Sequence, residues 1–138
     1  MTALSFTRTV AVDPDSAFTA WTDPAELARW WWPQWPDTEY ALDVRVGGSY
    51  RMHSAAVGIG VRGEYLAVDR PDGFTMTWVW IEDDAAAGEP AQPDTVQVSF
   101  TATDGSTTVT VVHTTDDAGA ESYRQGWDDV LARLPGLR

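Results

Sequence analysis

Two histidines, His53 and His113, are the only side chains of this chain whose ordinary pKa lies near neutral pH. A histidine can act as a general acid or base when it reaches a substrate proton. Strand alternation places His113 on the same face as Val111, which predicts an inward position, whereas His53 alternates with Met52 and faces the other way. His113 is therefore the one candidate catalytic residue, although a hydrogen-bonded core histidine is the interpretation that we favour.

The sequence offers little support for metal, thiol or cofactor chemistry. It contains no cysteine, and two histidines without carboxylates at matching spacing do not predict a metal site. It also lacks a nucleophile elbow, a phosphate loop and a catalytic carboxylate pair, so no cofactor is expected. Glu64, Arg51 and Arg62 could form a polar cluster beside a groove, but cross-strand ion pairs on a solvated face are favoured.

The eight tryptophans must dominate either the interior or a binding surface, because each indole can bury about 150–250 Å². Trp78 and Trp80 share one strand face with Phe74 and Met76. The concave side of a curved sheet needs an occupant, which is either a side chain or a ligand. The candidate ligand-binding residues are Met76, Trp78, Trp80, Phe100, His113, Tyr123, Trp127, Trp32 and Trp35.

Four tryptophans are concentrated in the segment ARWWWPQWP, residues 28–36. A helix buries only one stripe of side chains, so consecutive tryptophans of a helix cannot all enter the same core. Trp30 and Trp31 are predicted to anchor a short helix. Trp32 and Trp35 are predicted to form an exposed rim. This rim could border a cavity mouth, bind a protein partner or form a subunit contact in a homodimer.

The first third of the chain predicts one strand followed by two short helices. LSFTRTVAV alternates apolar and polar residues, as a half-buried strand does. Asp13-Pro14 and Asp23-Pro24 each supply an N-cap and a first helical residue. We expect the second helix to end at Pro33, so that each helix has about two turns.

The rest of the chain predicts six strands, joined mostly by short turns, and a C-terminal helix. An acidic, proline-bearing loop over residues 83–94 is expected to be exposed and mobile. Apolar residues at spacings of three and four predict a helix of roughly four turns over residues 120–134. Gly126 lies inside that helix, which indicates the close approach of another backbone or of a ligand.

This order predicts an α+β fold in a single domain over residues 1–138. A curved antiparallel sheet of about seven strands buries one face. The long C-terminal helix is the only element able to cover that face, and the two short helices close one end of the groove.

The charge argues against polyanionic partners. Nine basic residues, all arginine, stand against 21 acidic ones, for a net charge of −12, which repels nucleic acid and anionic membranes. No segment approaches the roughly 18 apolar residues of a membrane span, and MTALSFTRTV lacks the pattern of a signal peptide. A cytoplasmic protein without membrane insertion is expected.

The order of elements and several motifs resemble the helix-grip (START-like, SRPBCC) superfamily, and within it the family named after the activator of the heat-shock-protein-90 ATPase (AHSA1-like). The specific motifs are RVGGSYR, the pair TWVW and the late GW; AFTAWTDPAELARWW and VQVSFTATDGSTTVTVVHT agree in pattern. After His113, the acidic TTDDAGAES replaces the short glycine–aromatic run common in relatives. The resemblance implies the helix-grip fold, with a groove under the long helix as the functional site.

Three functions are consistent with this sequence. The favoured one is a binding protein that holds a small apolar or aromatic molecule between the sheet and the C-terminal helix. The second is a cavity enzyme of the polyketide cyclase or hydrolase type, with His113 as the acid or base. The third is a co-chaperone-like interaction domain that uses Trp32 and Trp35. Fold alone does not choose among them.

Overall fold

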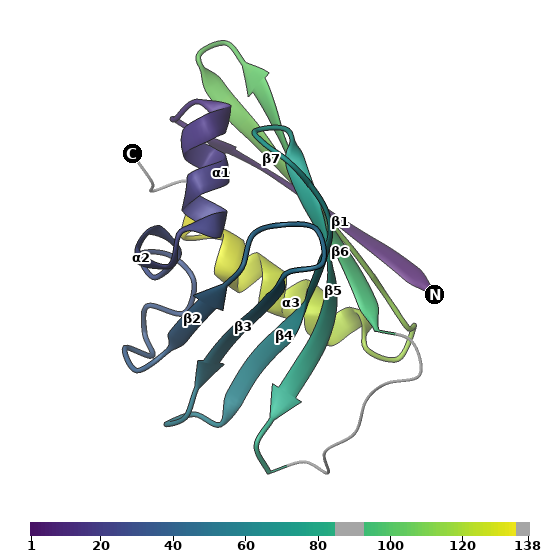
Figure 1. Ribbon diagram of the computed structural model, residues 1–138. Coiled ribbons are helices and arrows are strands. Elements are labelled where there is room, and N and C mark those ends of the chain that lie inside the picture. The colour runs from purple at the N-terminus through teal and green to yellow at the C-terminus, as the bar shows by residue number, and fades with distance from the viewer. Residues whose placement is uncertain (85–92, 135–138) are drawn as a thin grey trace.

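The computed structural model describes residues 1–84 and 93–134. The strands are β1 (Thr2–Val10), β2 (Glu39–Leu42), β3 (Ser49–Ser54), β4 (Ile59–Asp69), β5 (Gly73–Glu82), β6 (Asp94–Thr103) and β7 (Ser106–Thr115), and the helices are α1 (Pro14–Thr22), α2 (Pro24–Leu27) and α3 (Ala120–Leu131). The seven strands form one antiparallel sheet in the order β1-β7-β6-β5-β4-β3-β2 (Figure 1). The loop predicted for residues 83–94 lies largely outside the described residues.

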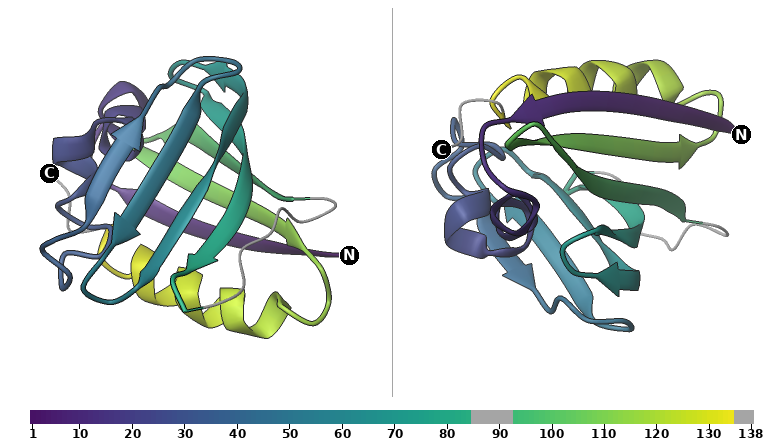
Figure 2. Two further views of the ribbon diagram at one scale, coloured as in Figure 1. Left: turned by 60° about the horizontal axis from the view of Figure 1, so that its bottom comes forward. Right: turned by 90° about the horizontal axis from the view of Figure 1, so that it is seen from above.

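The sheet curves strongly, and α3 runs along its open side next to β1 (Figure 2). Helices α1 and α2 cover one end of the curved sheet (Figure 1). This arrangement confirms the predicted helix-grip fold of seven strands, two short helices and a C-terminal helix. No helix among the described residues is long and apolar enough to cross a membrane.

Both short helices begin at the predicted Asp-Pro pairs. The Asp13 carboxylate accepts a hydrogen bond from the Ser16 backbone N–H at 2.8 Å. The Asp23 carboxylate accepts one from the Ala25 N–H at 2.9 Å, and a proline occupies the first helical position of each helix. Each carboxylate thereby satisfies an N–H that has no partner inside the helix.

The second helix is shorter than predicted. It ends at Leu27 after four residues, not at Pro33, and residues 28–33 form turns. Trp32 takes the left-handed conformation, with φ at 52°. In an uninterrupted helix, successive side chains point about 100° apart around the helix axis. Trp30, Trp31 and Trp32 could then not all be buried against the same core. The irregular turn allows all three side chains to be buried.

Strand β5 runs from the core to the solvent. Its alternate residues Phe74, Met76 and Trp78 are each 4 % exposed, whereas Trp80, next on the same face, is 38 % exposed. The opposite face of the strand lies on the outside of the sheet. One row of side chains on β5 therefore connects the buried interior with the surface.

Helix α3 is a little shorter than predicted, with 12 residues or just over three turns. Its residues Trp127, Val130 and Leu131 are buried against the sheet, and Leu134 is buried just beyond its end. These residues belong to the predicted apolar stripe. Tyr123, one turn before Trp127, is only partly buried.

Trp30 anchors the end covered by α1 and α2. Its side chain is fully buried, its indole N–H donates to the Ala20 carbonyl at 2.9 Å, and its ring centroid lies 4.7 Å from that of Trp21. Ring packing and the hydrogen bond together hold the segment after α2 against α1. This confirms the predicted structural role of Trp30.

We expect Trp30→Ala to lower the free energy of unfolding by about 3–5 kcal/mol, because it leaves a cavity and removes the bond to Ala20. Trp80→Ala is the matched control, since that indole is partly exposed, and it should cost less than half as much. Urea denaturation of the two variants measures both values. Equal losses would contradict the anchoring role of Trp30.

Candidate functional site

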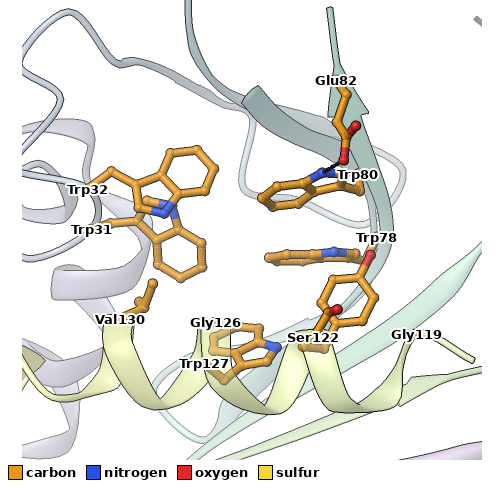
Figure 3. Close-up of a pocket in the computed structure, with 11 residues that line it drawn as sticks. Trp31, Trp32, Trp78, Trp80, Glu82, Gly119, Ser122, Gly126, Trp127 and Val130 are labelled. Atoms are coloured by element: carbon orange, nitrogen blue, oxygen red, sulfur yellow. Dashed lines mark hydrogen bonds between the residues drawn. The ribbon is translucent and has the colours of Figure 1, made fainter. Parts of the chain in front are cut away.

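A cavity of about 360 Å³ lies between β5, α3 and the segment that follows α2 (Figure 3). Pockets for small molecules commonly measure about 300–1,000 Å³ and are lined mainly by apolar and aromatic side chains. The lining residues are Trp31, Trp32, Trp78, Trp80, Glu82, Gly119, Ser122, Tyr123, Gly126, Trp127 and Val130. Five indoles and one phenol thus supply most of the wall.

Local structure explains how each wall is formed. Alternation along β5 puts Trp78, Trp80 and Glu82 on one face, and Figure 3 shows the rings of Trp78 and Trp80 one above the other. Trp127 and Val130, three residues apart, project from one side of α3. The turn after α2 supplies the opposite wall, where Trp31 and Trp32 face β5 (Figure 3).

Ring contacts fix the walls relative to one another. The Trp31 ring makes edge contacts with Trp127 at 5.5 Å and with Trp78 at 6.1 Å between centroids. The Trp32 ring stands perpendicular to Trp80 at 6.0 Å. Edge-to-face pairs at such distances are favourable by about 0.5–1.5 kcal/mol beyond area burial. The cavity therefore lies among rings that support one another.

The mouth of the cavity is polar. Trp80 is the most exposed of its tryptophans, and its indole N–H donates to Glu82 Oε1 at 3.0 Å (Figure 3). This bond holds the Trp80 ring in place on the strand. It also sets a carboxylate beside an aromatic surface that is open to solvent.

Two indole N–H groups of the inner wall lack hydrogen-bond acceptors. Nε1 of Trp31 and Nε1 of Trp78 are buried without a partner in the described part of the chain. The Trp78 N–H lies near enough to the Tyr123 hydroxyl to lower its pKa, but without hydrogen-bond geometry. Burial has the larger effect and raises the pKa of Tyr123 to about 12. A buried donor without an acceptor costs about 1–3 kcal/mol.

His113 is fully buried behind the wall and forms two hydrogen bonds. Its Nδ1 accepts the Trp127 indole N–H at 2.8 Å, and its Nε2 lies 2.9 Å from Asp94 Oδ2. An indole N–H can only donate, so Nδ1 carries no proton, and Nε2 donates to Asp94. Burial lowers the pKa of His113, and the Asp94 carboxylate partly opposes this effect. The structure places His113 as a hydrogen-bonded core residue.

Five of the predicted ligand-binding residues lie in the cavity wall: Trp32, Trp78, Trp80, Tyr123 and Trp127. Four others do not. His113 lies behind the wall, Met76 and Phe100 are 4 % exposed in the packed core, and Trp35 packs on Trp32 with 5.1 Å between ring centroids. Around Met76 the remaining void is only about 10 Å³, room for at most one water. Aromatic rings fill the groove at that end.

The predicted exposed rim is also corrected. Trp32 is 5 % exposed and Trp35 is partly buried, so the two do not form an open apolar patch. Gly126 meets no other backbone, because a Cβ built on it would find no atom within 4 Å. The space beside Gly126 is the cavity itself.

Some lining residues were missed at the sequence level. Glu82 follows Trp80 by two residues on β5, and Val130 follows Trp127 by three on α3, so the alternation and helical spacing already used could have found them. For Ser122, no spacing or alternation in the sequence indicated a place in the cavity wall. Trp31 was assigned an anchoring role, and its place in the wall depends on the turn after α2.

The remaining polar candidates lie outside this cavity. Arg51 and Arg62 are paired across β3 and β4, while Glu64 pairs with Ser49. The three line a separate hollow of about 760 Å³ on the outside of the sheet. His53, predicted to face away from the core, binds Asp83 at 3.0 Å. No cluster of metal-binding side chains is found in residues 1–84 and 93–134.

Comparison with known proteins identifies the family. The model of the family described as Activator of Hsp90 ATPase homolog 1-like protein matches residues 11–137, nearly the whole chain. The chain belongs to this family. No curated protein matches it. Its AHSA1-like fold recurs in many solved structures.

Three solved structures illustrate the likeness. Protein CV1439 from Chromobacterium violaceum is 25% identical, with a TM-score of 0.77 over 98% of this chain and 95% of that one. CalU16 from Micromonospora echinospora is 22% identical, with a TM-score of 0.72 over 96% and 73%. PFC0360w, an HSP90 activator from Plasmodium falciparum, is 20% identical, with a TM-score of 0.74 over 97% and 94%. Such identities show a shared AHSA1-like fold.

The buried His113 predicts a loss of stability in weak acid. Its pKa is lowered by folding, so the unfolded chain binds a proton more readily, and the free energy of unfolding falls as the pH drops below about 6.5. Denaturation at a series of pH values, with His113→Gln as the control, measures the effect. The variant should have a shallower slope just below pH 6.5, and equal slopes would contradict the prediction.

Trp127→Phe tests the hydrogen bond to His113 directly. The variant keeps an aromatic ring but removes the Trp127 N–H that donates to Nδ1, so we expect a higher pKa for His113 and a stability loss of about 1–3 kcal/mol. NMR titration of the imidazole protons gives the pKa, and His53 serves as the internal reference. An unchanged or lower pKa for His113 would show that Trp127 does not fix its protonation state.

Proposed function

We propose that this AHSA1-like protein binds a small, largely aromatic molecule in the cavity between β5 and α3. The observation that carries the proposal is the wall itself, in which five indoles and the Tyr123 ring surround about 360 Å³. Large aromatic surfaces that face a cavity are stabilised when an apolar molecule replaces water beside them. A planar ligand can contact several of these faces at once.

The character of the inner wall supports the proposal. Trp31 and Trp78 line the cavity, but their indole nitrogens have almost no accessible surface and no hydrogen-bond partner within the described residues. The inner wall therefore offers ring surface rather than hydrogen-bond donors. We expect the part of the ligand that contacts it to be apolar and aromatic.

A cavity enzyme that used His113 has less support. General acid–base catalysis requires a ring nitrogen within hydrogen-bond reach of the substrate. In His113, Nδ1 is bound to Trp127 and Nε2 to Asp94, so a substrate would have to displace one of these partners. The protein-interaction and homodimer alternatives depended on an exposed rim of Trp32 and Trp35, and Trp32 is buried.

Gly126 provides the test of this proposal. A Cβ added there meets no atom within 4 Å and lies beside the cavity, and replacing a helical glycine is favourable by about 0.5–1 kcal/mol. Gly126→Leu should therefore keep or raise the stability of the protein while blocking ligand binding. Gln125→Leu, on the neighbouring exposed position of α3, is the matched control.

The measurement is a titration of tryptophan fluorescence and thermal stability with neutral aromatic molecules of two or three rings. A ligand present at about a hundred times its Kd should add about 2.7 kcal/mol to the free energy of unfolding. We expect saturable binding to the wild type and to Gln125→Leu, and at least tenfold weaker binding to Gly126→Leu, a difference of about 1.4 kcal/mol. Equal binding to all three proteins would place the ligand elsewhere.

A further inference from the structure

We infer that the ligand of this cavity is an organic cation, an ammonium group attached to an aromatic body, with the positive charge at the mouth beside Trp80 and Glu82. The inference rests on the proposed function, since it names the chemical class of molecule that the same cavity accepts. It follows from the charges and the ring faces at the mouth.

The first observation is the sign of the charges around the cavity. Glu82 is the only charged residue among the described residues of the lining. Its Oε1 accepts the Trp80 N–H, and within the described chain its Oε2 forms no hydrogen bond, so the carboxylate can face a second partner. Asp94 and Asp116 join Glu82 in acting on the Tyr123 hydroxyl, each raising its pKa. Glu82 is thus the carboxylate that the cavity itself presents, and Asp94, which binds His113, and Asp116 add negative potential near Tyr123.

Arginine does not compensate for these carboxylates. None of the described arginines lines the cavity, and Arg124 on α3 faces Glu121 at 3.8 Å. The chain as a whole carries a net charge of −12. The electrostatic potential at the mouth of the cavity is therefore negative, so it attracts cations and repels anions. Low-dielectric aromatic walls strengthen this potential inside the mouth.

The second observation is the arrangement of rings at the mouth. The Trp80 centroid lies 6.0 Å from that of Trp32 and 6.5 Å from that of Tyr123. A cation is attracted to a ring face within about 6 Å of its centroid, and tryptophan gives the strongest interaction. At these separations an ammonium group beside Trp80 can lie within that range of the Trp80 ring and of one neighbouring ring, Trp32 or Tyr123. Ring faces together with a carboxylate are the features that bind alkylated ammonium groups.

The exposure of the lining residues gives the bound ligand an orientation. Trp31 and Trp78 are 2 % and 4 % exposed and line the inner part of the cavity, whereas Trp80 and Glu82 lie at the solvent side. A ligand with its aromatic body against the inner rings and its ammonium group at the mouth matches this arrangement.

Three probes of nearly equal shape test the inference: phenyltrimethylammonium, its uncharged isostere tert-butylbenzene, and the anion benzenesulfonate. Fluorescence titration should give phenyltrimethylammonium a Kd about tenfold lower than that of tert-butylbenzene, as expected for a partly desolvated cation–π contact. Benzenesulfonate should not saturate over the same range. Raising the salt concentration should weaken only the cation, because salt screens exposed charges.

Glu82→Gln isolates the carboxylate, since its amide oxygen can still accept the Trp80 N–H. We expect it to raise the Kd of phenyltrimethylammonium severalfold and to leave that of tert-butylbenzene unchanged. Glu39→Gln removes an equal charge at an exposed position of β2 outside the cavity, and it should change neither value.

The outcomes separate the two proposals. If tert-butylbenzene or benzenesulfonate binds as tightly as the cation, or if Glu82→Gln leaves the cation's Kd unchanged, the inference of a cationic ligand is overturned. Binding of tert-butylbenzene that Gly126→Leu blocks would in that case still support the proposed function. If neither phenyltrimethylammonium nor tert-butylbenzene binds saturably, both proposals fail.

Discussion

The packing of Trp31 joins helix α1 to the two elements, β5 and α3, that form the other walls of the cavity. Its ring contacts those of Trp21 on α1, Trp78 on β5 and Trp127 on α3, with centroid separations of 6.3, 6.1 and 5.5 Å. The sheet and α3 also meet directly here, because the Trp78 and Trp127 rings lie 5.4 Å apart between centroids. Because one ring touches all three elements, the width of the cavity depends on where Trp31 sits. In this position the Trp31 indole N–H is buried and has no acceptor among the described residues, which is unfavourable.

His113 helps to hold the cavity wall in position. A neutral imidazole can accept from one side and donate on the other, and here it links Trp127 on α3 to Asp94 at the start of β6. The bond fixes the indole whose ring forms the floor of the cavity. A residue that suggested catalysis at the sequence level therefore holds the wall in position, and its lowered pKa follows from burial.

The cavity occupies only one end of the groove. Near α1 the inward rings of Trp21, Phe74 and Phe100 pack against one another and leave almost no space. Toward the end of β5 the same face of the strand carries Trp80 and Glu82 into solvent. Along this one strand, the inward-facing side chains thus change from packed apolar residues near α1 to an exposed indole and a carboxylate at the cavity mouth. The AHSA1-like fold supplies the curved sheet and the long helix, and the side chains at this end decide what can bind.

The sequence by itself determined the order of the elements, because caps, alternation and helical spacing are local signals. Asp13 and Asp23 located the helix starts, and alternation placed His113 inside and His53 outside. Alternation also put Trp78 and Trp80 on one face. Each of these features depends on residues only a few positions apart.

The tertiary structure alone decided which aromatic side chains fill the groove and which line it. Met76 and Trp78 share a strand face, yet one is packed in the core and the other borders the cavity. Trp32 is buried because the chain takes a positive φ at that residue, which no periodicity could predict. The distance between rings on β5, on α3 and after α2 is set by the curvature of the sheet and the position of the helix. Those quantities arise from the packing of residues that lie far apart in the chain.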